Sequence, residues 1–216
     1  MSIQNVIVAT KNAGKIREIR QILGENVNVC TMSEAGFTGE IDETGTTFED
    51  NALIKARTIY EAYQESGRFD LVISDDSGIE IDFFDKKPGV YSSRWLGEDT
   101  PYDVKNQIVL DKMKDAPDDK RTARYVCAIA AILKSGEEII VKKTAEGRIA
   151  KSPSGQGGFG YDPIFEFTGE PGDVLPEGLV PGMTFADISA EMKHAVSHRG
   201  KALRALYKEL AERSLI

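Results

Sequence analysis

The 216-residue chain is poor in cysteine, has no excess of basic residues and contains no long apolar run. Its two cysteines, Cys30 and Cys127, both fall in apolar segments, which favours buried thiols in a reducing compartment over a disulfide framework. No apolar run approaches the roughly 20 residues that a membrane-spanning helix needs. The first apolar segment, residues 3–9, follows no charged leader or cleavage site, so we expect a cytoplasmic protein that does not enter a membrane.

Acidic residues outnumber basic ones by 35 to 27, so the formal net charge is −8. This balance disfavours a general nucleic-acid surface, because such surfaces are basic. A polyanionic ligand must therefore be a small molecule that meets a local cluster of Lys and Arg. The length fits one domain over residues 1–216, or one domain with two lobes.

The hydrophobic pattern predicts an α/β fold with a mixed sheet, because strands and helices alternate early in the chain and strands pair as hairpins later. The expected elements lie at residues 6–9, 16–23, 27–31, 48–63, 124–133, 139–141 and 197–214. Thr47 is expected to cap the second helix. A further helix opens at Pro101 and is expected to bury Val104, Ile108 and Met113.

An acidic stretch in the middle of the chain is the strongest candidate for a catalytic site. An apolar strand leads into Asp75 and Asp76, at the point where that strand is expected to end. Ser77 and Gly78 then predict a tight turn, and residues 79–83 a second strand running back. Adjacent carboxylates repel each other unless a cation or a proton lies between them. Taken alone, the stretch fits a solvated turn better than a metal site.

The polar loop between the first strand and the first helix is a candidate phosphate site. It consists of Thr10, Lys11, Asn12, Ala13, Gly14 and Lys15. A helix that follows such a loop presents free backbone N–H groups to an anion, and Lys11 and Lys15 add positive charge. The glycines and the Lys-Ser/Thr pair of a Walker sequence are missing. An ordinary strand-to-helix turn explains this segment equally well.

Residues 155–160 match the spacing GxGxxG, which indicates dinucleotide binding only between a strand and a helix. Tyr161, Asp162 and Pro163 follow, and the proline predicts the start of a strand, so hydride transfer is disfavoured. The loop instead presents Phe159, Tyr161 and Asp162, which suits closure over a planar base. A surface loop without a ligand is the alternative interpretation.

His194 and His198 are four residues apart, so on one helix face they could bind zinc. No third ligand has a suitable spacing, and Arg199 would repel a cation. The cations Lys193, Arg199 and Lys201 favour an anion or a keto oxygen at this place instead.

Several short stretches occur together in the order typical of one known family. They are residues 10–15, 43–55, 74–78, 88–94, 157–163 and 197–200. Their joint order and spacing resemble the inosine triphosphate pyrophosphatase family over nearly the whole chain, although no single stretch is decisive. The resemblance implies a homodimeric α/β protein with two lobes around a long mixed central sheet flanked by helices, and an active-site cleft between the lobes. It also implies Mg²⁺-dependent hydrolysis of ITP, dITP and XTP to the nucleoside monophosphate and pyrophosphate.

The resemblance further implies roles for individual residues. Asp76 would be the proton acceptor and a metal ligand, with Asp50 and Asp75 as further ligands. The implied substrate contacts are Thr10, Lys11, Asn12, Ala13, Gly14, Lys15, Ser77, Phe159, Gly160, Tyr161, Asp162, Lys193, His198 and Arg199. Arg199 or a protonated His198 would donate to the 6-keto oxygen of hypoxanthine, whereas the 6-amino group of adenine would oppose these donors.

Two features depart from the family pattern. The family usually has Glu-Asn-Ala where this chain has Asp50-Asn51-Ala52, so one implied metal ligand is a methylene shorter. The loop over residues 168–182 is also longer than expected. Three alternatives stay open at this point: a pyrimidine-directed pyrophosphatase related by fold, a dinucleotide oxidoreductase, and a nucleotide-binding dimer without catalytic activity.

Overall fold

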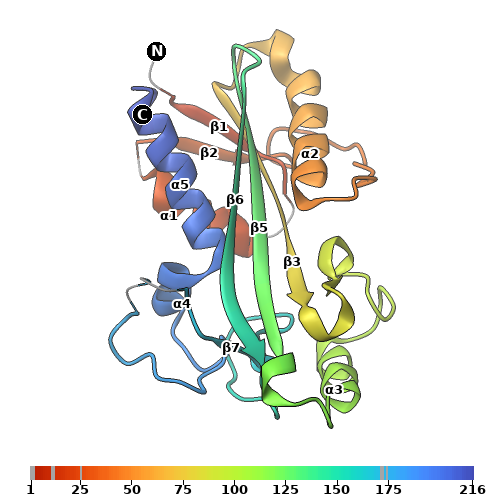
Figure 1. The fold of residues 1–216 in the computed structure, drawn as a ribbon. Helices are drawn as coiled ribbons and strands as arrows, with labels where there is room; N and C mark the ends of the chain where they lie inside the picture. Colours follow the sequence, from red (N-terminus) through yellow and green to blue (C-terminus); the bar gives the residue numbers. More distant parts are fainter. Residues whose placement is uncertain (1–2, 11–12, 25, 171–172, 174) are drawn as a thin grey trace. The chain divides into compact units, whose positions relative to one another are not determined.

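A computed structural model describes residues 3–10, 13–24, 26–170, 173 and 175–216 (Figure 1). The α-helices are α1 (Ala13–Leu23), α2 (Phe48–Tyr63), α3 (Tyr102–Lys112), α4 (Ala190–Val196) and α5 (His198–Glu212). The strands are β1 (Asn5–Val8), β2 (Asn28–Thr31), β3 (Leu71–Ile81), β4 (Lys87–Pro88), β5 (Thr122–Leu133), β6 (Glu138–Ile149) and β7 (Phe165–Phe167). Short 3-10 helices are η1 (Gln64–Ser66), η2 (Asp82–Phe84), η3 (Gly89–Tyr91), η4 (Asp118–Lys120) and η5 (Asp162–Ile164).

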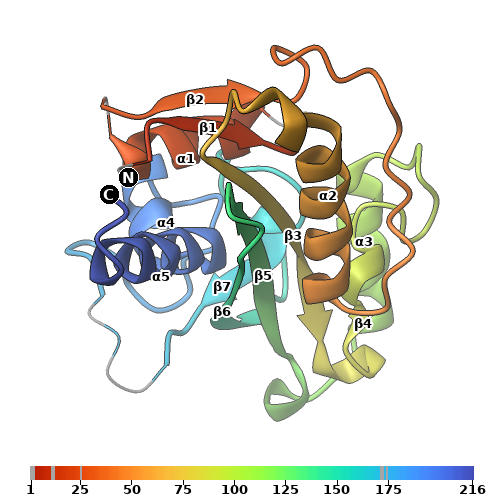
Figure 2. The same cartoon turned by 90° about the horizontal axis from the view of Figure 1, so that it is seen from above.

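The described strands form a seven-stranded sheet in the order β2-β1-β3-β5-β6-β7, with β4 paired to β3. Strand β1 runs parallel to β2 and to β3, whereas β3 and β4, and likewise β6 and β7, are antiparallel. The sheet is therefore mixed, and helices flank it (Figures 1 and 2). The α/β fold class predicted from the sequence is confirmed.

The chain divides into two compact units, and β3, β5 and β6 each contribute residues to both. Unit 1 comprises Met1–Asp76, Cys127–Lys143 and Lys201–Ile216. Unit 2 comprises Ser77–Val126 and Thr144–Gly200. The described part of the chain has no helix that is long and apolar enough to span a bilayer.

Unit 1 has a core between one face of its strands and the helices α1 and α5. Val8 and Ile73 of the strands pack there with Ile19 of α1 and with Leu203 and Leu206 of α5. Helix α2 lies on the opposite side of the strands from α1 and α5 (Figure 2). Unit 1 is thus a three-layer arrangement in which both faces of the strands are covered, as expected for parallel strands.

Helix α2 begins where the sequence predicts. Thr47 is its N-cap, and the Thr47 hydroxyl accepts a hydrogen bond from the backbone N–H of Asp50 at 3.1 Å. Ala52 and Ala56 are buried at helical spacing, and the hydroxyl of Ser74 in β3 donates to the carbonyl of Ala52. The small buried residues therefore let α2 approach the strand closely.

The prediction of a hairpin at Ser77 and Gly78 is wrong, because β3 continues through both residues to Ile81. Ile79 and Ile81 are fully buried, and β3 has the long strand β5 as its neighbour in the sheet. Local Asp, Ser and Gly preferences favour a turn, but pairing and burial along the whole strand outweigh them.

Helix α3 buries a partly different face from the one predicted, since Met113 is buried as expected but Val104 is not. In α3, Val104 is 44% exposed, and the buried residues include Lys105 and Asn106. Both make polar contacts within unit 2: Lys105 donates to the carbonyl of Ser93 at 2.7 Å. Specific tertiary contacts therefore select the buried face, which the apolar pattern alone did not indicate.

Candidate active site

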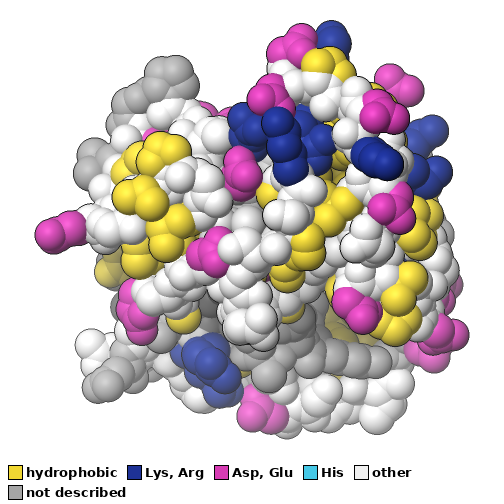
Figure 3. Space-filling model, turned by 90° about the horizontal axis from the view of Figure 1, so that it is seen from below, with side chains coloured by type: hydrophobic (Ala, Val, Ile, Leu, Met, Phe, Trp, Pro, Cys, Tyr) yellow, Lys and Arg dark blue, Asp and Glu magenta, His cyan; other side chains and the backbone are white. Residues whose placement is uncertain are grey.

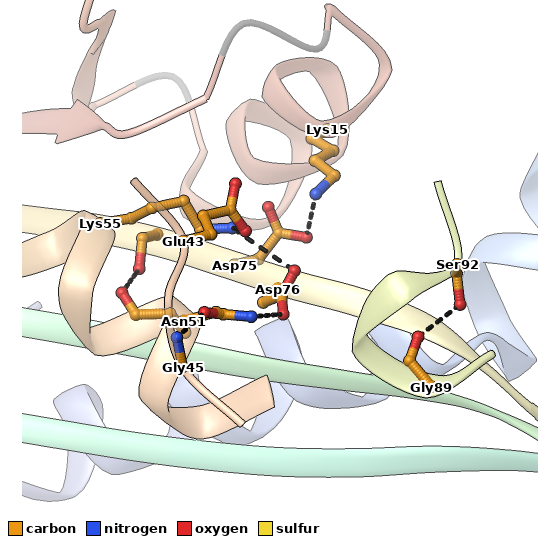
Figure 4. Close-up of polar contacts among 11 residues, drawn as sticks. Lys15, Glu43, Gly45, Asn51, Lys55, Asp75, Asp76, Gly89 and Ser92 are labelled. Carbon is orange, nitrogen blue, oxygen red and sulfur yellow. Dashed lines mark hydrogen bonds and ion pairs between the residues drawn. The ribbon is translucent and has the colours of Figure 1, made fainter. Parts of the chain in front are cut away.

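Unit 1 contains a group of charged and polar side chains that we call the carboxylate–lysine cluster. Its members are Lys15, Glu43, Asn51, Lys55, Asp75 and Asp76 (Figure 4). They come from α1, from the segment that precedes α2, from α2 and from β3. Ser74, Asp75 and Asp76 are buried although they are polar, which is uncommon for carboxylates unless they are paired.

Asp76 receives its contacts from helix α2. Asn51 Nδ2 donates to Asp76 Oδ2 at 3.2 Å, and Lys55 Nζ lies 3.5 Å from Asp76 Oδ1. Asn51 and Lys55 are four residues apart and so lie on one helix face. Asn51 Oδ1 accepts the backbone N–H of Gly45 at 2.8 Å. A Cβ atom on Gly45 would lie 2.7 Å from that oxygen, so this position requires glycine for the close approach.

Two carboxylates converge on the ammonium group of Lys55. Its Nζ lies 2.8 Å from Glu43 Oε2 and 3.5 Å from Asp76 Oδ1. The Lys55 side chain is 11% exposed and that of Glu43 is 35% exposed, so the pair reaches from the interior to solvent. The arrangement therefore concentrates negative charge around one cation.

Burial raises the pKa of Asp76 above its ordinary value. The nearby charge of Lys55 opposes this shift, and the charge of Glu43 adds to it. Burial alone would lower the pKa of Lys55, but attraction by Asp76 and Asp75 and the bond to Glu43 outweigh it, so the pKa of Lys55 is raised. Lys55 therefore stays charged, while Asp76 is a stronger base than an exposed aspartate.

Asp75 has a different partner from its neighbour Asp76. Its Oδ2 lies 2.8 Å from Lys15 Nζ, and the Asp75 side chain is 1% exposed (Figure 4). Successive side chains of a strand point to opposite faces. The two carboxylates therefore have different nearest lysines.

Asp50 lies at the start of α2, and its side chain is exposed. Its neighbour Glu49 forms an ion pair with Lys142 at 2.9 Å. Among the described residues, no three His, Cys, Asp or Glu side chains lie close enough together to hold a metal ion. The metal role of Asp50, Asp75 and Asp76 stays a prediction.

The predicted phosphate loop follows β1 in unit 1. Thr10 is half-buried after the strand, and Lys15 lies in the first turns of α1, which begins at Ala13 and continues through Gly14. Lys11 and Asn12 lie outside the described residues. The structure thus places a basic side chain of the predicted loop, Lys15, in the carboxylate–lysine cluster.

Unit 2 contains a second group of predicted site residues, which we call the Asp162 cluster. Asp162 is 1% exposed. It accepts hydrogen bonds from the backbone N–H of Phe159 at 2.7 Å, from the hydroxyl of Tyr125 at 3.2 Å and from Lys193. The Lys193 ammonium also lies 4.4 Å from the centre of the Phe159 ring, a cation–π contact. Phe159 is 56% exposed, so it is available to stack on a base.

Tyr125 links His198 to this cluster. The two rings stack with centroids 4.7 Å apart and planes 10° from parallel. His198 and Arg199, in the first turn of α5, are both buried. Ser197 ends α4 before α5 begins, so His194 and His198 lie on different helices and the shared helix face needed for zinc does not exist.

Gly160 and Tyr161 are held in place by neighbouring backbone and side chains of unit 2. Asn106 Nδ2 donates to the Gly160 carbonyl at 3.1 Å, and the Tyr161 hydroxyl donates to the Ser92 carbonyl at 3.1 Å. Residues 155–160 lead into η5 and β7 rather than into an α-helix, as predicted. Ser77 is half-buried in β3.

Sequence analysis missed Glu43, Asn51, Lys55 and Tyr125 as site residues. The spacing of Asn51 and Lys55 on one face of a capped helix was a usable signal. Glu43 lies in a segment without regular structure, and Tyr125 is in an apolar strand. Neither residue could be distinguished from its surroundings by pattern alone.

Buried carboxylates of one strand that meet lysines of two helices, one with a raised pKa, mark a candidate enzyme active site. The chain belongs to the Ham1 family, whose family model matches residues 6–209. The family membership predicted from the sequence is thereby confirmed.

Relatives with similar sequences cover almost the full length. The dITP/XTP pyrophosphatase of Clostridium perfringens is 38% identical over 206 residues, covering 94% of this chain and 96% of the relative. That of Exiguobacterium sibiricum is 42% identical over 204 residues, covering 93% and 94%.

Solved structures of proteins with similar sequences have a similar fold. The Ham1 protein of Staphylococcus aureus has a TM-score of 0.82 at 32% identity, covering 97% of this chain and 100% of that one. The nucleoside-triphosphatase, dITP/XTP pyrophosphatase, of Mycobacterium abscessus has a TM-score of 0.70 at 38% identity, covering 94% and 98%.

Proposed function

We propose that this protein hydrolyses the non-standard purine nucleoside triphosphates ITP, dITP and XTP to the monophosphate and pyrophosphate, and so removes them from the nucleotide pool. Family membership and the printed activity of the relatives support the substrate class. The observation that carries the chemistry is the buried Asp76 carboxylate, which shares the Lys55 ammonium with Glu43.

In the proposed reaction a water oxygen attacks the α-phosphorus and the bond from that phosphorus to the bridging oxygen breaks. Pyrophosphate leaves with the bridging oxygen, and Asp76 accepts the proton of the water. A base works best when its pKa approaches the operating pH, and the pKa of Asp76 is shifted upward. Lys15 and Lys55 offset charge on the triphosphate.

We further propose that Mg²⁺ binds beside Asp76, with Glu43 as a second ligand. Mg²⁺ usually takes one or two carboxylates, several waters and substrate phosphates rather than a full protein cage. Two carboxylates that already converge on a cation, Lys55 Nζ, fit that requirement. When bound, the ion supplies a Lewis acid that neutralises phosphate charge.

The Asp162 cluster is proposed to recognise the base. The exposed Phe159 ring offers a stacking face, and Lys193 is fixed beside it. His198 and Arg199 are the proposed donors to the 6-keto oxygen, a group that adenine lacks.

We also propose that the chain acts as a homodimer. Large apolar side chains of unit 2 are exposed, among them Phe83, Tyr91 and Val104, and groups of apolar side chains reach the surface on the face in Figure 3. Where exposed apolar side chains form a large contiguous patch, that patch marks an interaction site. Sedimentation equilibrium tests this proposal, and the mass of a single chain at micromolar concentration contradicts it.

The function is tested by measuring pyrophosphate release from ITP, dITP, XTP, GTP, ATP, CTP and UTP, each with and without Mg²⁺. We expect ITP, dITP and XTP to turn over far faster than ATP or CTP, and only with Mg²⁺. Equal rates on ATP and ITP contradict the base recognition, and faster rates on pyrimidines favour the pyrimidine-directed alternative. Orthophosphate as the product contradicts the assigned bond, and binding without turnover leaves only a nucleotide-binding role.

A further inference from the structure

We propose that Asp75 is a positioning residue that holds Lys15 in place for the triphosphate, rather than a ligand of the metal ion. This inference rests on the proposed function, because it assigns Lys15 to the phosphates of the substrate. The carboxylate of Asp75 lies 2.8 Å from the ammonium of Lys15, and their side chains are 1% and 18% exposed. A buried anion therefore anchors a cation that reaches the surface.

The geometry of β3 separates Asp75 from Asp76. Side chains alternate along the strand: Ile73 packs in the core with α1, whereas Ser74 donates to a carbonyl of α2. Asp75 shares the side of Ile73 and contacts Lys15 of α1. Asp76 shares the side of Ser74 and contacts Asn51 of α2. The two carboxylates are thus directed to different cations by the alternation of the strand.

The ion pair gives Lys15 a defined position. A free lysine side chain samples many rotamers, and that freedom opposes binding when the side chain must be ordered. An ammonium group has three N–H donors, so a lysine that is held by one carboxylate can also donate to a phosphate oxygen. Asp75 therefore reduces the cost of ordering Lys15 before the anion binds.

A positioning role and simple Coulomb attraction predict opposite changes in the affinity of Asp75→Asn for an anion. Removal of a negative charge near an anion site should strengthen anion binding by Coulomb attraction. Loss of the anchor should weaken it instead. We expect the dissociation constant for inorganic tripolyphosphate, measured by calorimetry without Mg²⁺, to rise about tenfold, as for the loss of a charge-assisted contact.

Asp70→Asn is the matched control, because it removes the same charge from unit 1. The Asp70 carboxylate accepts the backbone N–H groups of Gln4 and Asn5 instead of meeting a lysine of the cluster. We expect it to leave the tripolyphosphate dissociation constant unchanged or slightly lower.

The decisive measurement is the coupling between Asp75 and Lys15 in tripolyphosphate binding. Lys15→Met should weaken tripolyphosphate binding, and Asp75→Asn should have no further effect in the Lys15→Met background. If Asp75→Asn does not fold, Asp75→Glu is measured in its place. Glu keeps the negative charge but moves it by one methylene. Asp75→Glu should weaken tripolyphosphate binding only when Lys15 is present.

Four results overturn the inference. The first two are that the wild type does not bind tripolyphosphate, or that Asp75→Asn binds it as tightly as wild type or more tightly. The other two are that the effect of Asp75→Asn persists in the Lys15→Met background, or that Asp75→Asn loses as much Mg²⁺ binding as Asp76→Asn does. Tripolyphosphate binding is measured without turnover. A wild type that binds it but releases no pyrophosphate from ITP therefore contradicts the proposed function and leaves this test intact.

Discussion

Asp75 and Asp76 are consecutive residues of β3, yet one carboxylate meets Lys15 and the other meets Lys55. The alternation of side chains along a strand explains this separation. Each acid has a lysine as its nearest cation, and each lysine also attracts the other acid. The two residues should consequently respond differently to the same substitution.

Asp76→Asn should abolish most turnover while the fold stays intact. The amide keeps the shape of the side chain but can neither accept the proton nor carry the charge that attracts Mg²⁺. We expect kcat for ITP to fall by about 10³-fold, within the range of a positioned base. A variant within tenfold of wild type in a pyrophosphate-release assay would show that another carboxylate performs this role.

The same variant should be more stable than wild type at pH 7. Because burial raises the pKa of Asp76 in the folded protein, the carboxyl group stabilises the fold below its unfolded pKa, about 3.9. That contribution is lost as the pH rises through the folded pKa. Asn is neutral throughout, so the thermal midpoint of Asp76→Asn without Mg²⁺ should exceed that of wild type at pH 7. The difference should shrink toward pH 4, and a lower midpoint at pH 7 would contradict the shift.

Glu43→Gln and Asp50→Asn distinguish the two candidates for the second metal ligand. Glu43 shares a cation with Asp76, whereas the Asp50 side chain is exposed at the start of α2. We expect Glu43→Gln to weaken Mg²⁺ binding by about tenfold or more, a typical loss at metal sites, and Asp50→Asn to leave it within about twofold. Calorimetric titration with Mg²⁺ checks this, and the reverse order would support Asp50 as the ligand.

Tyr125→Phe should raise KM for ITP with little change in kcat. The substitution keeps the ring that stacks on His198 but removes the hydroxyl that donates to Asp162. A net hydrogen bond contributes about 0.5–1.5 kcal/mol, so KM should rise by about tenfold at most. Tyr63→Phe is the control, because its hydroxyl donates to the Ala35 carbonyl away from both clusters. An equal change in KM in both variants would indicate a general loss of stability.

Thr47→Ala should lower the free energy of unfolding by about 1 kcal/mol, the usual cost of losing an N-cap. Thr47 caps α2 through the N–H of Asp50. Thr58→Ala in the same helix removes a hydroxyl that donates to the carbonyl of Ile54, and it should change stability by less than about 0.5 kcal/mol. Urea denaturation measures both, and equal losses would argue against a capping role.

The sequence by itself determined the fold class, the main helices and the family. The periods of 2 and 3.6 residues in the apolar pattern depend on local geometry, so α2 begins at its predicted cap and β5 covers the predicted apolar run. The family resemblance rests on several motifs in a fixed order, which the chain carries directly. These features can be predicted without knowing which residues distant in sequence are in contact.

Only the tertiary structure decided where β3 ends and which partners its two acids have. Local residues at 74–78 favour a turn, but burial of Ile79 and Ile81 and a long neighbouring strand extend β3 to Ile81. That extension places Asp75 and Asp76 within a strand and so gives them separate lysines. Lys55 reaches Asp76 across 21 residues, and Tyr125 reaches Asp162 across 37. Contacts at such separations depend on how elements pack, because no local pattern in the chain encodes them.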